Sequence, residues 1–96
     1  MEAYNVVRFK VKPGQEAKFI EMHKNFPKRP GMKGGALVKT GDRTYCFIGN
    51  WESFDKIAAA RPEMISLLDS FRGMLEDLGG GLGVTDPVSG SVVVEI

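Results

Sequence analysis

Apolar and polar residues alternate along residues 3–12 ("AYNVVRFKVK"), which predicts a first β-strand. Asn5, Val7 and Phe9 share one side of this strand with Val11, and the opposite side is more polar. Residues 15–26 then place apolar side chains at spacings of three and four, which predicts an amphipathic helix. Its inward stripe consists of Phe19, Met22, His23 and Phe26.

A connection over residues 27–35 follows, because its two prolines do not allow the helix to continue. Residues 36–40 predict a short second strand, and "GDR" at 41–43 predicts a hairpin turn. The third strand is predicted in "TYCFIGNWESFDK", residues 44–56, where both parities are mostly apolar, so that both faces are expected to be covered. Ser53 is the expected N-cap of the next helix. Trp51 lies between strand and helix, and we expect it to be chiefly structural.

A helical region is predicted over residues 53–78, with a second helix beginning at Pro62, because proline suits a first helical turn better than a helix interior. The glycines at 79–81 would end this helix. Residues 85–90 ("TDPVSG") predict a turn, and residues 91–96 ("SVVVEI") predict the final strand. The apolar stripe of the second helix consists of Leu67, Leu68, Phe71, Met74, Leu75 and Leu78.

The predicted order is β-α-β-β-α-β, which is typical of an α+β, ferredoxin-like fold with a four-stranded antiparallel sheet and both helices on one face. The third strand and the valine-rich final strand are apolar on both sides. The sheet face without helices therefore needs a cover, and a second copy of the chain is the simplest one. The pattern predicts a homodimer joined through sheet faces.

Length and composition narrow the choice of class. The 96 residues are expected to form a single domain, 1–96. The net charge of +1 is spread along the chain, which argues against a nucleic-acid surface. With one cysteine and one histidine, neither a disulfide within the chain nor a Cys/His metal site is expected. We find no apolar run long enough for a membrane span and no signal region, so a cytoplasmic location is expected by default.

Two segments resemble the antibiotic biosynthesis monooxygenase-like domains of the dimeric α+β barrel superfamily. They are "VVRFKVKPGQEAKFIE", with its Lys12-Pro13-Gly14 turn, and "CFIGNWESFDK", with Trp51-Glu52-Ser53. The resemblance covers nearly the whole chain. It implies a face-to-face homodimer, a pocket between each sheet and its helices, and in some relatives a cofactor-free oxygenation of phenolic or quinol-like compounds. Other relatives degrade haem, act as isomerases or have no known reaction.

The sequence departs from that family on the helix after Trp51. Many members carry histidines there, whereas this chain has Ala60 and Glu63 near those places. The haem-degrading members use an Asn, a Trp and a His. Asn5 lies on the corresponding strand but nearer its start, Trp51 is at the strand end, and the haem-ligating histidine has no counterpart. Haem degradation is therefore not expected, and no cofactor is predicted.

Two polar residues are the candidates for catalysis, His23 and Asn5. His23 shares an inward stripe with phenylalanines, so it is either a core residue or a pocket base. Asn5 needs a hydrogen-bond partner when buried, either a backbone group or a ligand. The candidate substrate-binding side chains are apolar: Phe9, Phe19, Leu67, Leu68 and Phe71.

The remaining reactive or unusual residues are weaker candidates for a functional site. Cys46 is expected to be an inert core thiol, and Tyr45 to face either a pocket or the dimer seam. "LGGGLG", 78–83, lacks the context of a phosphate loop, because it follows a helix and has no Gly-Lys-Ser/Thr ending.

Three functions remain open at this point. The first is a cofactor-independent monooxygenase or isomerase that acts on a small aromatic or quinol-like compound. The second is a non-catalytic binding domain, comparable to the effector domains of feast/famine regulators. The third is a structural homodimer whose pocket is filled by its own side chains.

Overall fold

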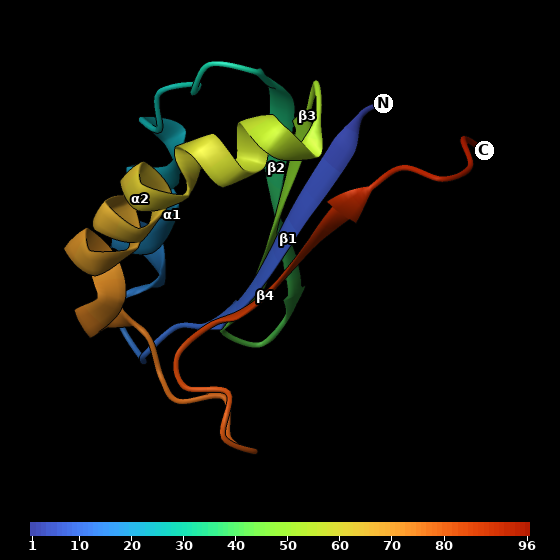
Figure 1. The fold of residues 1–96 in the computed structure, drawn as a ribbon. Helices are drawn as coiled ribbons and strands as arrows, with labels where there is room; N and C mark the ends of the chain where they lie inside the picture. The colour runs from blue at the N-terminus through green and yellow to red at the C-terminus, as the bar shows by residue number, and fades with distance from the viewer.

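The computed structural model describes all residues, 1–96, and has the predicted order of elements. Four strands form one antiparallel sheet in the order β2-β3-β1-β4. Both helices lie on the same side of this sheet (Figure 1). This is the ferredoxin-like α+β arrangement that the sequence predicted. The elements are β1 (Ala3–Lys10), α1 (Glu16–Lys24), β2 (Met32–Gly41), β3 (Thr44–Trp51), α2 (Phe54–Phe71), a short 3-10 turn (Arg72–Met74) and β4 (Asp86–Ser91).

The central strands β1 and β3 agree closely with the prediction, and their pairing fixes the geometry of the molecule. Asn5 lies opposite Gly49, and Val6 lies opposite Ile48. β2 begins at Met32, earlier than predicted, with an irregularity in its pairing between Met32 and Gly34. The hairpin between β2 and β3 has Arg43 in the left-handed region, with φ of 57°.

The helix α2 corrects one prediction. It continues through Pro62, where a new helix had been expected to begin. Proline has no N–H to donate to the carbonyl of Ala58, and this bends a helix more readily than it ends one when both halves are held by packing. Ile57 and Ala60 before the proline, and Phe71 after it, are all buried. Figure 1 shows the α2 ribbon changing direction partway along its length.

The helix also ends earlier than predicted, at Phe71. Met74 lies in the 3-10 turn, and Leu75 is extended and pairs with Val11 in an isolated bridge. Both side chains are still buried, so their hydrophobic pattern reflected the core and not the helix. Leu78 lies beyond these elements, where its N–H donates to the carbonyl of Gly83.

The final strand was predicted in the wrong place. β4 consists of Asp86–Ser91, most of which had been assigned to a turn, and the expected strand 91–96 is absent apart from Ser91. The reason is the reach of the neighbouring strand: Ala3 pairs with Ser91, and the N–H of Val92 donates to Glu2. Beyond that point β1 has no further residues to pair with. The remaining apolar tail is exposed and extends past the sheet (Figure 1).

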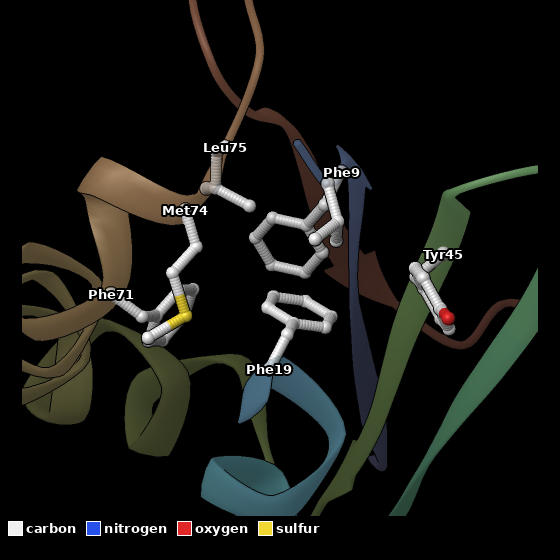
Figure 2. Packing of buried hydrophobic residues seen from close by; sticks show 7 residues of the cluster. Phe9, Phe19, Tyr45, Phe71, Met74 and Leu75 are labelled. Atoms are coloured by element: carbon white, nitrogen blue, oxygen red, sulfur yellow. The ribbon is translucent and has the colours of Figure 1, made fainter. Parts of the chain in front are cut away.

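Two groups of buried side chains form the core on the helix side of the sheet. The larger group joins β1, α1 and the end of α2, and Figure 2 shows Phe9 and Phe19 between the sheet and the helices. Their rings meet edge to face, with centroids 5.5 Å apart. The smaller group contains Ala3, Trp51, Ile57 and Ala60. Neither helix is long and apolar enough to cross a lipid bilayer.

Candidate functional site

A cavity of about 650 Å³ lies on the helix side of the sheet, between the two core groups. Its walls include Phe9 and Phe71 from the larger group, and Trp51 and Ile57 from the smaller one. Most of the lining is apolar. A cavity of this size with few polar groups is typical of small-molecule sites.

The structure brings most of the candidate residues to this cavity. Asn5, Phe9, His23, Leu67, Leu68 and Phe71 all line it. Phe19 does not: it is fully buried behind the wall, in contact with the rings of Phe9 and His23. Phe19 therefore supports two lining residues without facing the cavity.

His23 is half-buried in an aromatic cage. Its ring centroid lies 4.4 Å from that of Phe19, 4.3 Å from that of Phe26 and 5.2 Å from that of Phe71. Nδ1 lies 2.9 Å from the carbonyl oxygen of Phe19, one helical turn earlier. Because a carbonyl only accepts, Nδ1 carries the proton, and Nε2 of the neutral ring keeps its lone pair. Burial lowers the pKa of His23, so the neutral ring is favoured at pH 7.

Asn5 is held by a side chain and not by the backbone. The indole N–H of Trp51 donates to Asn5 Oδ1 at 2.7 Å. The amide group of Asn5 is left with one weak acceptor, the sulfur of Met64 at 3.9 Å from Nδ2. Asn5 is only 6% exposed, so its remaining N–H capacity can be met only by something in the cavity.

Gly49 makes the bond between Trp51 and Asn5 possible. It lies opposite Asn5 in the sheet, and Trp51 follows two residues later on the same face. A Cβ atom at position 49 would lie 2.3 Å from Asn5 Oδ1 and 2.9 Å from Trp51 Nε1. Neither distance is tolerated by real side chains. A glycine inside a strand indicates such a close approach, and this clue in the sequence could have pointed to the Trp51–Asn5 pair.

Tyr45 faces neither the main cavity nor the open face of the sheet. Its hydroxyl donates to the carboxylate of Glu16 on α1, and Lys39 Nζ lies 3.0 Å from the same carboxylate oxygen. The hydrogen bond from Tyr45 is the main cause of the lowered pKa of Glu16. Burial, followed by this hydrogen bond, raises the pKa of Tyr45. The cluster fastens α1 to the sheet.

The one cysteine and the acidic residues do not form a further reactive or metal-binding group. Cys46 is a free, half-buried thiol. No group of three or more His, Cys, Asp or Glu side chains could hold a metal ion. Chemistry in the cavity therefore rests on an imidazole, an amide and the cations at its opening.

Comparison with known proteins gives matches in structure alone. No protein-family model matches the chain, and no curated protein matches it by sequence. SnoaB, a cofactor-independent oxygenase from Streptomyces nogalater solved as a mutant, superposes with a TM-score of 0.71 at 19% identity, covering 99% of this chain and 96% of that one. A monooxygenase from ActVA-Orf6 of Streptomyces coelicolor, bound to nanaomycin D, gives 0.71 at 19% identity, with 98% and 89% covered.

A third structure, a mutant of MhuD with two manganese protoporphyrin IX molecules per active site, gives 0.67 at 17% identity, with 98% and 97% covered. Proteins of unknown function match as well. These likenesses establish that the chain has the ferredoxin-like fold of antibiotic biosynthesis monooxygenase-like domains, as the resemblance in sequence predicted.

The residues of the cavity do not fit a porphyrin of the MhuD kind. α2 contains no histidine that could ligate a metal at the porphyrin centre. The one histidine of the chain, His23, lies on α1 instead, where its Nδ1 is bonded to the carbonyl of Phe19.

Proposed function

We propose that this protein is a cofactor-independent monooxygenase that oxidises a small aromatic or quinol-like compound in the cavity between sheet and helices. The observation that carries the proposal is the largely apolar cavity that is lined by a neutral imidazole, His23, and a buried amide, Asn5. The likeness of the fold to SnoaB and to the ActVA-Orf6 monooxygenase adds support.

In this proposal His23 is the general base. Its Nε2 lone pair takes a proton from the acidic position of the substrate, and the lowered pKa of the ring keeps it unprotonated before substrate binds. The amide N–H of Asn5 donates to the oxyanion that develops on the substrate, and Trp51 holds the amide in this orientation. The aromatic walls exclude water, which strengthens both interactions.

Oxygen then reacts with the substrate anion directly. The anion gives one electron to O₂, and the resulting radical pair combines into a carbon-bound peroxide. The O–O bond of this peroxide breaks as the carbon that bears the peroxide loses its remaining hydrogen as a proton. A CH₂ group is thereby converted to a carbonyl with one atom of O₂, and the second oxygen atom leaves as water. The electrons come from the substrate, so no further reductant is needed.

Oxygen uptake with an anthrone such as 1,8-dihydroxyanthrone tests the proposal. The expected result is uptake of one O₂ for each anthraquinone formed, faster than autoxidation, with one ¹⁸O atom from ¹⁸O₂ in the new carbonyl. His23→Gln should lower the enzyme-dependent rate about 10²- to 10⁴-fold, as expected for loss of a general base. Lys18→Gln, an exposed change on the same helix away from the cavity, is the control. Full turnover by His23→Gln would refute the assigned base.

The same cavity could serve a non-catalytic binding domain, and the oxygen assay separates the two functions. A binder would take up the aromatic compound without accelerating its oxidation. A reduced, cytoplasmic setting, in which Cys46 stays a free thiol, belongs to the same proposal.

A homodimer joined through sheet faces is also part of this proposal. The sheet face without helices carries Val6, Ile48 and Val38, and 41% of Val38 is exposed. In the exposed tail, Val93 and Val94 are 86% and 73% accessible. A stable pair buries at least roughly 1,200 Å² in total, and a second copy laid on this face would cover the apolar surface that the helices leave open.

A further inference from the structure

The opening of the cavity carries positive charge. Three of its lining residues are cations, namely Lys28, Arg29 and Arg61, and none of its lining residues is an acid. Lys28 and Arg61 are exposed although they line the cavity, which places them at its mouth. The chain as a whole has a net charge of only +1, so this local excess is a property of the cavity.

Most cations elsewhere in the molecule are paired, but those at the mouth are not all paired. Arg29 Nη1 lies 3.0 Å from Glu63 Oε2, which joins the segment before β2 to α2. Lys28 approaches only a backbone carbonyl, that of Lys33, at 3.4 Å. The Arg61 side chain, on α2, has no hydrogen-bond or ion-pair partner. The structure has eight ion pairs. Only the one between Arg29 and Glu63 involves a cation at the mouth of the cavity.

Arg61 lies on α2 beside the apolar wall of the cavity. It lies one turn after Ile57 and one turn before Ile65, and both of these side chains line the cavity. An aromatic ring against this wall would therefore place its outer end near the guanidinium group. Guanidinium groups favour carboxylates, which accept two parallel hydrogen bonds from them.

We propose that the compound bound in this cavity is an aromatic carboxylate, with its ring system inside and its anionic group held at the mouth by Arg61 and Lys28. The inference rests on the proposed function in one respect: it takes the cavity between sheet and helices to be the site of binding. It adds a substrate class that the fold alone does not specify.

Isothermal titration with two isosteric compounds, 2-naphthoate and 2-naphthamide, tests the charge directly. The wild type should bind the carboxylate more tightly than the neutral amide, by about two- to five-fold for each unpaired cation, as for exposed ion pairs. Added salt should shrink this ratio. In the double variant Lys28→Gln/Arg61→Gln the ratio should approach one, while affinity for 2-naphthamide stays unchanged and so reports an intact cavity.

The matched control is Lys12→Gln/Lys18→Gln, which removes two exposed, unpaired cations away from the cavity and should preserve the wild-type ratio. Equal affinity of the wild type for the two compounds, or the same loss in both double variants, overturns the inference. Failure of both compounds to bind overturns it as well. Tight, charge-dependent binding without oxygen uptake would support this inference and refute the oxygenase proposal, so the two can fail separately.

Discussion

Replacing Gly49 with alanine tests the geometry of the candidate site more sharply than any change to the candidate residues themselves. The substitution adds a single methyl group to the centre of β3, at a position with no unusual backbone angle. Its Cβ would fall 2.3 Å from Asn5 Oδ1 and 2.9 Å from the indole nitrogen of Trp51. Asn5 or Trp51 must therefore move, and their 2.7 Å hydrogen bond is lost.

The cost can be worked out from two contributions. Leaving a buried donor and acceptor unpaired costs about 1–3 kcal/mol, and forcing an extra carbon into a packed core costs a further ~1–3 kcal/mol. We expect the free energy of unfolding to fall by about 2–6 kcal/mol in Gly49→Ala. For a domain of about 100 residues each kcal/mol shifts the Tm by about 4–8 °C, so the melting temperature should fall by at least ~8 °C.

Circular dichroism provides both measurements that are needed. The far-ultraviolet melt gives the change in Tm, and the near-ultraviolet spectrum follows Trp51, the only tryptophan of the chain. Gly90→Ala is the matched control, because it lies in β4 and a Cβ atom there meets nothing within 4 Å. It should melt within a few degrees of the wild type.

A double-mutant cycle locates the cause. In an Asn5→Ala background the closest contact of the new methyl group is absent, so adding Gly49→Ala should cost much less than it does alone. If Gly49→Ala melts like the wild type, or costs as much without Asn5 as with it, the account of the Trp51–Asn5 pair is wrong.

Three further predictions concern protons and association. Burial lowers the pKa of His23 below 6.5, so on acidification the unfolded chain binds this proton before the folded chain does, and the free energy of unfolding should fall as pH drops through 6.5. Denaturant titrations at several pH values would contradict this if the free energy of unfolding depended on pH equally in the wild type and in His23→Gln. Tyr45→Phe should raise the pKa of Glu16 toward its ordinary value, and an unchanged carboxyl titration by NMR would exclude the hydrogen bond as its cause. Ile48→Glu should convert a dimer to monomers in light scattering, whereas Leu82→Glu, on an exposed loop, should not; a monomeric wild type would end the dimer proposal.

Periodicity predicted the parts of the fold that are set by local packing. β1 alternates, β3 is a continuous, mostly apolar run, and Phe19 begins a stripe that faces the core. β4 could not be found this way, because Asp86–Ser91 contains proline and glycine and is a strand only through its partner β1. Val92 to Val94 have the stronger strand propensity but no strand left to pair with. Pairing here overrode propensity.

The candidate site was predicted in outline and missed in its contacts. Parity on β1 and the helical stripe brought Asn5 and His23 to one side of the sheet, and both line the cavity. The bond from Trp51 to Asn5 depends on the register between β1 and β3, which a single sequence does not specify. The cations at the mouth come from a connecting segment and from α2, and only the folded chain brings these together.

The position of β4 at the border of the sheet has a consequence for aggregation. A border strand with free N–H and C=O groups can add further strands without limit, as in amyloid. Pro87 has no N–H to offer on β4, and the opposite border strand, β2, carries the charged Lys33 and Lys39. Growth by strand addition is therefore disfavoured at both ends of the ladder, although an apolar tail follows β4 directly.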